Sequence, residues 1–188
     1  MEKKVTVQKM CLIGLMAAMV YVSSAFLQIP IPTAIGNTRL HMGNVMCLLS
    51  GLLLGPMGGG LAAGIGSMFF DLTNPLFISS APFTFVFKFL MAWLCGKIYM
   101  AFGHQKNPLW ISINAAAAGN LLYIVLYLGK SFFEAAVFLQ QPMAGVLLSV
   151  AQKGTVSLMN GVTAVIAAVP LSLAIRPALG KIMMKTIG

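Results

Sequence analysis

Charged side chains are scarce in this sequence, and acidic ones are nearly absent. Asp and Glu together number 3 among 188 residues, and charged residues make up 8% of the chain. A soluble domain carries about a quarter charged residues, so the composition excludes a soluble globular fold. It also excludes disorder, which needs low hydrophobicity, because 59% of the chain is hydrophobic and its mean hydropathy is +0.93.

Motifs of catalysis and metal binding are missing as well. The chain has no HExxH and no GxSxG motif, and its glycine-rich run at 55–60 lacks the Gly-Lys-Ser/Thr ending of a nucleotide-binding loop. Cys11, Cys47 and Cys95 lie in apolar stretches without CxxC spacing, which favours buried free thiols over a disulfide framework or a zinc site. We therefore expect no enzymatic activity, no cofactor and no metal.

Long apolar stretches fill most of the chain and predict an all-α membrane protein, a single integral domain over residues 1–188. A bilayer is crossed by about 20 residues of helix, so the chain has room for a bundle of six transmembrane helices. Proline and glycine turn signals separate the stretches. The expected spans are 8–27, 41–54, 61–72, 80–102, 109–128 and 144–175.

The segments between these spans are expected to be irregular. Residues 29–40 read as a loop, 57–60 as a continuation of the turn at Gly55-Pro56, and 130–142 as an amphipathic connection. Arg176-Pro177 is expected to close the last span, before a short basic helix at the end of the chain.

The positive charges indicate the topology, because short loops rich in Lys and Arg stay in the cytoplasm. An even number of spans places both termini on one side. Only Arg39 and Lys130 fall on the opposite side. The charges on the terminal side are Lys3, Lys4, Lys9, Lys97, Lys106, Arg176, Lys181 and Lys185. We therefore expect both termini to be cytoplasmic.

Small residues at helical spacing predict two close helix contacts, since small side chains let helix backbones approach inside lipid. Gly60 and Gly64 fall in the third expected span, where internal packing is the favoured interpretation. Gly14 and Ala18 fall in the first span. There, internal packing and a docking face for another membrane protein both remain open.

Polar residues inside the expected spans are costly and mark functional sites. Lys88 and Lys153 lie at a similar depth below the outer surface, and other polar groups share that depth. One interpretation is a structural pair of Asp71 with Lys88, plus lysines that extend toward the surface. The other is a polar cavity that opens outward. The candidate ligand-binding residues are Arg39, His41, Asn44, Asp71, Lys88, Asn120, Tyr123, Tyr127, Gln152, Lys153 and Asn160.

The residue types suggest what such a cavity would bind. Its excess of positive charge favours a ligand with a carboxylate, a phosphate or several hydrogen-bond acceptors. Tyr123, Tyr127, Phe83 and Phe85 could provide flat walls for a ring. His41 alone is weak support, because a single histidine at a helix start more often caps or hydrogen-bonds.

Two segments resemble a known family. The stretches RLHMGNVMCLLSGLLLGPMGGGLAAGIGSMFFDL (39–72) and APFTFVFKFLMAWLCGKI (81–98) are similar to the S component, the substrate-binding subunit, of energy-coupling factor (ECF) vitamin transporters. Shared features are a long first loop, an LLxGP turn, a third helix rich in Gly and Ala, and a fourth helix that begins with proline and carries a lysine.

The resemblance implies a six-helix membrane subunit that captures a vitamin or related micronutrient from outside a prokaryotic cell and releases it inside. The implied partners are a T component and two cytoplasmic ATPases, so any ATP hydrolysis belongs to other subunits. The loop at 29–40 would close over the site. The family's Ala-x-x-x-Ala face toward the T component corresponds here to Gly14 and Ala18.

The resemblance leaves the vitamin open among pyridoxine, pantothenate, folate, a thiamine precursor and riboflavin. An alternative function is a self-contained secondary transporter or small channel for a polar solute, which predicts paired carboxylates within the spans; Asp71 is the one available. A third alternative is a membrane enzyme or an assembly scaffold.

Overall fold

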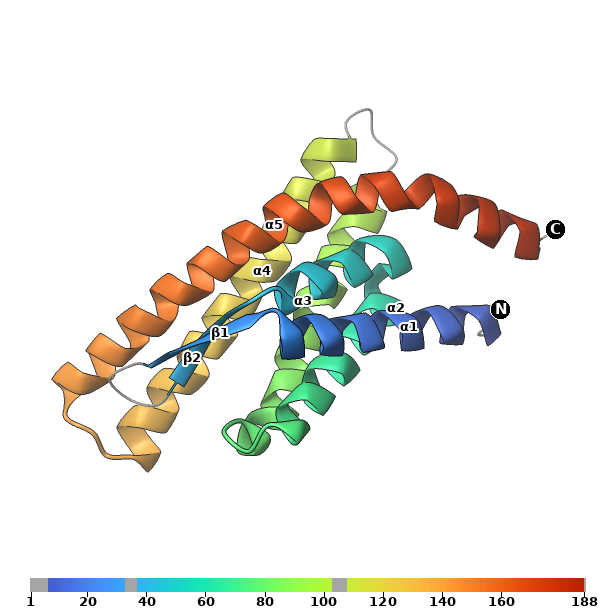
Figure 1. The fold of residues 1–188 in the computed structure, drawn as a ribbon. Coiled ribbons are helices and arrows are strands. Elements are labelled where there is room, and N and C mark those ends of the chain that lie inside the picture. Colours follow the sequence, from blue (N-terminus) through green and yellow to red (C-terminus); the bar gives the residue numbers. More distant parts are fainter. Residues whose placement is uncertain (1–6, 33–36, 103–107, 188) are drawn as a thin grey trace.

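A computed structural model describes residues 7–32, 37–102 and 108–187 (Figure 1). The elements in chain order are α1 (Val7–Phe26), β1 (Gln28–Pro32), β2 (Asn37–His41), α2 (Gly43–Thr73), the short 3-10 helix η1 (Ile78–Ser80), α3 (Ala81–Phe102), α4 (Pro108–Phe133), the π-helix η2 (Glu134–Phe138) and α5 (Met143–Ile187). Five of the described helices are long and apolar enough to cross a membrane. The predicted all-α membrane class is confirmed. Lys3, Lys4 and Lys106 lie outside the described residues, as do the side chains of Lys181 and Lys185.

Helix α2 covers both the second and the third expected span. It reverses at Gly55, whose φ of +75° lies in the left-handed region that favours glycine. The two halves lie side by side on either side of Gly55, as shown by the hydrogen bond that the Ser50 hydroxyl donates to the Gly59 carbonyl at 3.0 Å. The expectation that residues 57–60 extend the turn is wrong: they are helical. A Cβ on Gly59 would stand 2.5 Å from the Gly51 Cα, so glycine there permits the close contact. The count of six spans stays a prediction.

Residues 29–40 contain an antiparallel β-hairpin where a loop was expected. Strands β1 and β2 pair with Ile29 opposite Leu40 and Ile31 opposite Thr38. β-Branched side chains favour extended backbone. The prolines of β1 do not prevent pairing, because in a two-stranded ribbon each strand has a free edge where a missing donor is tolerated.

Helices α4 and α5 run further than their sequence patterns indicated. Helix α4 ends at Phe133 instead of near 128, so Lys130 belongs to the helix. Helix α5 continues through Pro170 and Pro177, so Arg176-Pro177 does not end it. Proline is tolerated in membrane helices because neighbouring groups satisfy the freed backbone carbonyl.

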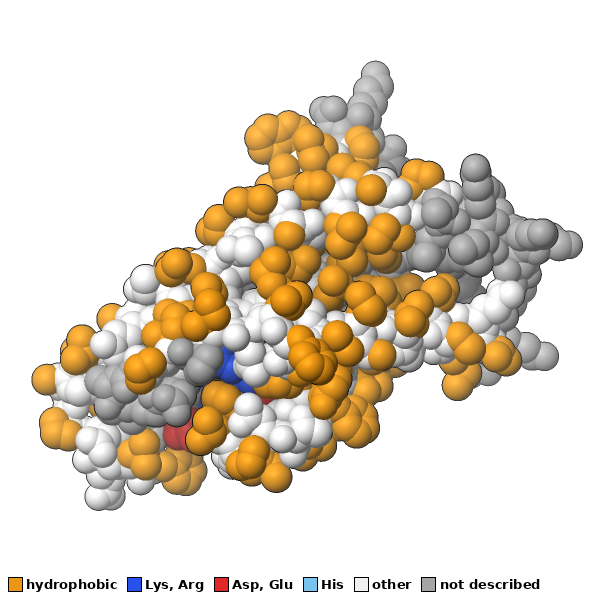
Figure 2. Space-filling view, viewed as in Figure 1, with side chains coloured by type: hydrophobic (Ala, Val, Ile, Leu, Met, Phe, Trp, Pro, Cys, Tyr) orange, Lys and Arg blue, Asp and Glu red, His pale blue; other side chains and the backbone are white. Residues whose placement is uncertain are grey.

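The core is built from small residues and close helix contacts. Gly60 and Gly64 face Phe89 and Phe85 of α3, which confirms internal packing for this motif. Cys47 and Cys95 are buried as expected, but Cys11 is exposed on α1. On the face that Figure 2 shows, large hydrophobic side chains are spread over the described surface, and a few charged ones are visible near the hairpin. This distribution suits a lipid-facing surface.

Different elements lie at the two ends of the bundle. The start of α1 and the end of α5 lie at one end, and the hairpin and η2 lie toward the other (Figure 1). Which end faces the cytoplasm stays a prediction from the positive charges. The polar residues of interest gather at the hairpin end.

Candidate ligand-binding site

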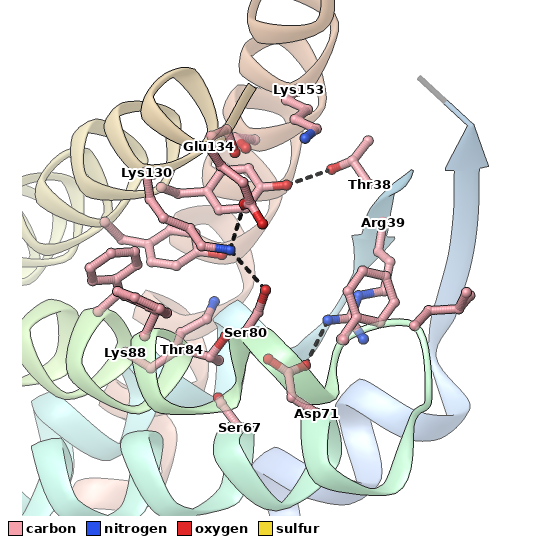
Figure 3. Close-up of a pocket in the computed structure, with 18 of the residues that line it drawn as sticks. Thr38, Arg39, Ser67, Asp71, Ser80, Thr84, Lys88, Lys130, Glu134 and Lys153 are labelled. Atoms are coloured by element: carbon pink, nitrogen blue, oxygen red, sulfur yellow. Dashed lines mark hydrogen bonds and ion pairs between the residues drawn. The ribbon is translucent and has the colours of Figure 1, made fainter. Parts of the chain in front are cut away.

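A cavity of about 280 Å³ lies at the hairpin end. Its wall takes residues from α1, β2, α2, η1, α3, α4, η2 and α5. Figure 3 shows Lys88, Lys130 and Lys153 projecting into one space from three helices, with Arg39 and Asp71 across from them. The size is near the lower end of the range for small-molecule sites, about 300–1,000 Å³.

Arg39 connects the hairpin to α2 and to Phe77, the residue that precedes η1. Its guanidinium Nη2 donates to Asp71 Oδ1 at 2.8 Å. The same group lies 4.5 Å from the centre of the Phe70 ring and 3.7 Å from that of Phe77, so cation–π contacts add to the ion pair. The Arg39 Nη1 is buried and has no hydrogen-bond partner among the described residues. One side of this guanidinium is therefore unsatisfied.

The hairpin is also attached to α5. The Asn160 side chain accepts a hydrogen bond from the His41 N–H at 2.9 Å and donates to the Arg39 carbonyl at 2.6 Å. An amide side chain offers both a donor and an acceptor, so Asn160 pairs with β2 as a neighbouring strand would. Strand β2 is thus bonded to β1, to α2 through Asp71 and to α5 through Asn160.

Lys88 lies at the deeper part of the cavity and is only 3% exposed. Its ammonium hydrogen-bonds to the Asn44 side-chain oxygen and lies 3.7 Å from the centre of the Tyr123 ring. Tyr123 in turn stacks on Tyr127, with ring centres 5.9 Å apart and planes 13° from parallel. No carboxylate among the described residues forms an ion pair with Lys88. The alternative of an Asp71–Lys88 pair is therefore wrong, because Asp71 pairs with Arg39.

The outer part of the wall holds a second ion pair. Lys130 Nζ lies 2.8 Å from Glu134 Oε2 and also donates to the Ser80 hydroxyl at 2.8 Å. The Tyr127 and Thr38 hydroxyls lie 3.4 Å apart, within hydrogen-bond distance. Lys153 lines the same space, where Glu134 attracts it and Lys130 repels it. Tyr127 thus connects α4 to the hairpin, and Lys130 connects α4 to η1 and η2.

His41 is held in its neutral form. Burial, followed by the positive charges of Lys88 and Arg39, lowers the pKa of His41 well below its usual value of 6.5. Its Nδ1 accepts a hydrogen bond from the Gly43 N–H at 3.1 Å, at the start of α2. His41 therefore satisfies the first backbone N–H of α2 as well as lining the cavity.

Most of the predicted polar residues line this cavity, and three do not. Asn44 lies behind Lys88 as its hydrogen-bond partner, Asn120 packs against Gly161, and Gln152 is exposed; these are not in the wall. Phe85 packs against Gly64, whereas Phe83 and Phe87 line the cavity. The predicted residues in the wall are Arg39, His41, Asp71, Lys88, Tyr123, Tyr127, Lys153 and Asn160.

Lys130, Glu134 and Thr38 also line the cavity, although sequence reasoning placed them outside the site. A signal for the first two was present: Lys130 and Glu134 have the i,i+4 spacing that places two side chains on one helix face. Thr38 gave none, because its position depends on the hairpin.

Two similarities to known proteins complement this geometry. A stretch of 69 residues, 37% of this chain, is 39% identical to a Pyrococcus woesei protein described as "uncharacterized protein in gap 3'region". The match covers 44% of that protein's length. A family model described as "ECF-type riboflavin transporter, S component" matches residues 4–177. The chain therefore belongs to this family of ECF S components, which are vitamin-binding subunits of membrane transporters and not enzymes.

Proposed function

We propose that this protein captures a flavin-type vitamin, riboflavin in the first instance, from outside a prokaryotic cell. It delivers the vitamin inside together with a T component and two cytoplasmic ATPases. The observation that carries the proposal is the family match over residues 4–177, combined with a cavity of about 280 Å³ at the hairpin end. The description of the family names riboflavin, and the wall chemistry supports a ligand of that kind.

The cavity wall combines flat rings with hydrogen-bonding groups, as a flavin requires. Tyr123, Tyr127, Phe83 and Phe87 offer aromatic surface to a planar ring system. Thr84, Ser131 and Ser157 add hydroxyls beside them. A flavin has a planar three-ring system with carbonyl acceptors and a hydroxylated chain, so both parts find complementary groups.

The hairpin is the proposed cover of the site. It contributes Thr38, Arg39 and His41 to the wall, and side chains of α2 and α5 hold it in place. A cover held by a few polar contacts can open at modest cost and still exclude water when shut. Release then requires these contacts to break.

Flavin binding is tested by titrating riboflavin against the purified full-length protein in detergent and following flavin fluorescence. We expect saturable quenching with one site, and about a tenfold weaker affinity in Tyr127→Leu, from the loss of ring stacking. Leu121→Ala is the matched control, because Leu121 is exposed on the same helix. If another vitamin binds and riboflavin does not, the flavin assignment is wrong while the transporter role stands.

Docking to the T component is proposed for the α1 face around Gly14 and Ala18. Both residues are exposed, and a Cβ at Gly14 would meet nothing within 4 Å. We predict that Ala18→Trp abolishes vitamin uptake in cells that express all four subunits, while ligand binding by the isolated chain is unchanged. Leu121→Trp, on the exposed face of α4, should leave uptake intact. Loss of both binding and uptake in Ala18→Trp would indicate damage to the fold and contradict the docking role.

A further inference from the structure

Lys88 is the most deeply buried cation in the described wall of the cavity. It is 3% exposed, whereas the side chains of Arg39 and Lys130 are 15% and 19% exposed and Lys153 is half-buried. Lys88 lies seven residues after the start of α3, about two turns inside the bundle from the hairpin end. A charge at that depth in a membrane span usually serves a substrate or an ion path.

Lys88 still has a hydrogen-bond donor to offer. An ammonium group has three N–H donors. One is used by the side-chain oxygen of Asn44, and the centre of the Tyr123 ring lies 3.7 Å from the Lys88 Nζ. Both contacts are with neutral groups, and no carboxylate among the described residues pairs with Lys88. The deep end of the cavity is therefore a place for a hydrogen-bond acceptor.

The carboxylates of the described wall are engaged by other cations. Asp71 pairs with Arg39, and Glu134 pairs with Lys130. Figure 3 shows Glu134 and Lys88 on opposite sides of the space. The Glu134 side chain is 48% exposed, so it can also accept from a ligand. The cavity thus offers a buried donor at its deep end and an accessible acceptor toward η2.

Two stacked rings connect these regions. Tyr123 and Tyr127 lie on successive turns of α4, with ring centres 5.9 Å apart and planes 13° from parallel. Tyr123 contacts Lys88, and the Tyr127 hydroxyl lies 3.4 Å from that of Thr38 on the hairpin. A flat ring system placed along this pair would present one edge to Lys88 and extend toward the hairpin.

Resting on the proposed function, we infer that the flavin binds with its carbonyl edge toward Lys88, and that Lys88 is the residue that sets this orientation. The ring carbonyl oxygens of a flavin accept and do not donate, so they match a buried ammonium. The ring N–H between them can donate to the hydroxyl of Ser67, which also lines the cavity. The ligand needs no charge of its own, because a charged donor forms a strong hydrogen bond with a neutral carbonyl.

This orientation directs the hydroxylated chain toward the outer part of the cavity. Each hydroxyl of the chain carries a donor, and a buried donor without an acceptor is costly. Glu134 and the hydroxyls of Thr38 and Ser80 supply acceptors there. The opposite orientation would place the chain donors against the Lys88 ammonium, which accepts no hydrogen bond.

The test compares riboflavins that carry a methyl group at one end or the other. In 3-methylriboflavin the methyl group replaces the hydrogen of the N–H between the carbonyls, and in 5′-O-methylriboflavin it caps the chain. Binding to the purified full-length protein in detergent is followed by fluorescence quenching. We expect 3-methylriboflavin to bind about a hundredfold more weakly than riboflavin, because the buried edge has no room and loses a donor, and 5′-O-methylriboflavin to bind within about threefold of it.

Variants then assign the orientation to Lys88. Lys88→Met should weaken riboflavin binding about tenfold or more, through loss of a charged donor. Lys97→Gln is the control, because Lys97 lies on the same helix, is exposed, and is not in the cavity wall.

A second readout separates the charge of Lys88 from its shape. Reduced flavin carries negative charge on its carbonyl-bearing ring, and a cation beside that ring stabilises it. The reduction potential of the bound flavin, measured at saturation, should therefore be more negative in Lys88→Met than in the unmodified protein and unchanged in Lys97→Gln. If Lys88→Met lowers thermal stability, Lys88→Gln replaces it, because Gln keeps a neutral donor for Asn44.

The outcomes separate this inference from the proposed function. If 3-methylriboflavin binds as tightly as 5′-O-methylriboflavin, the orientation is wrong, while riboflavin binding stands. An unchanged reduction potential in the Lys88 variant would overturn the contact with the carbonyl edge, since Lys88 would then act by shape alone. Failure of riboflavin itself to bind would overturn the proposed flavin function, and the orientation with it.

Discussion

The two ends of this bundle each contain a partly buried arginine, and the two arginines are bonded in opposite ways. At the end where α2 reverses, Arg176 donates to the Leu52 carbonyl at 3.3 Å, hydrogen-bonds to the Tyr99 hydroxyl and lies 3.6 Å from the centre of the Tyr99 ring. At the hairpin end, Arg39 lines the cavity and pairs with Asp71, but its buried Nη1 has no hydrogen-bond partner among the described residues.

Packing around the two ends differs in the same sense. At the reversal, a Cβ on Gly96 would stand 2.6 Å from the Gly55 carbonyl carbon and 2.7 Å from the Pro56 nitrogen, so the helices meet backbone to backbone. At the hairpin end, a comparable set of helices encloses about 280 Å³ of space. The polar groups at the α2 reversal therefore complete the packing, whereas those at the hairpin end line a cavity.

The largest predicted effect is at the packed end. Gly96→Ala places a methyl group against the backbone of Gly55 and Pro56, and we expect it to lower the free energy of unfolding by about 3 kcal/mol. Thermal denaturation in detergent measures the change. Gly129→Ala is the matched control, since a Cβ there meets nothing within 4 Å. Similar stability in both variants would contradict the close contact.

Arg176→Met should separate stability from binding. It removes the hydrogen bonds to Leu52 and Tyr99, and we expect a loss of about 2 kcal/mol in the free energy of unfolding. Riboflavin affinity, measured by fluorescence quenching, should be unchanged because Arg176 is not in the cavity wall. A weakened affinity at unchanged stability would erase the distinction between the two ends.

Asn160→Ala tests the attachment of the hairpin to α5. Two hydrogen bonds to β2 are lost, so bound flavin should dissociate about tenfold faster in stopped-flow measurements. Amide hydrogen exchange at residues 37–41 should also increase in the ligand-free protein, which a mere loss of ligand contact would not produce. Thr155→Ala is the control, because the hydroxyl of that residue donates to the Ala151 carbonyl within α5, its one hydrogen bond among the described residues. Unchanged exchange would mean that Asn160 does not hold the hairpin.

The smallest effect concerns pH. The pKa of His41 is lower in the folded protein than its unfolded value near 6.5, so the unfolded chain binds the proton more readily. The free energy of unfolding should be fully retained above about pH 6.5 and fall as the pH decreases through that value toward the folded pKa. Denaturation series from pH 7.5 to 5 should show a shallower decline in His41→Gln. Identical slopes would exclude His41 as the group responsible.

The sequence predicted the site better than it predicted the backbone around it. Polar residues at a shared depth in apolar segments are rare and costly, so Arg39, Asp71, Lys88 and Lys153 stood out without any model of the chain path. Gln152 misled because depth alone does not say which side of a helix a residue occupies; the structure places it on an exposed face. Glu134 has the i,i+4 spacing from Lys130 as a local signal, but its place at the cavity depends on how α4 continues into η2.

The wrong predictions about the fold share one physical origin: contacts between segments override what the local pattern indicates. Residues 57–60 follow the turn signal Gly55-Pro56 and resemble a continuation of it, yet they are helical, and glycine at 59 allows the close contact with Gly51. The prolines and polar residues of 29–40 favour a loop by local pattern, whereas the structure pairs two strands there. Pairing of β2 with Asn160, 119 residues further along the chain from His41, is not visible in any local pattern.

Composition alone determined that this chain is a helical membrane protein, because hydrocarbon admits few charges and requires backbone groups to bond within each segment. The sequence also indicated which few polar groups needed a reason to be there. Only the tertiary structure decided which cation each carboxylate neutralises: Asp71 pairs with Arg39 and leaves Lys88 facing the cavity. That choice depends on distances of a few ångströms between segments far apart in sequence, and ion pairing falls off too steeply with distance for the order of residues to reveal it.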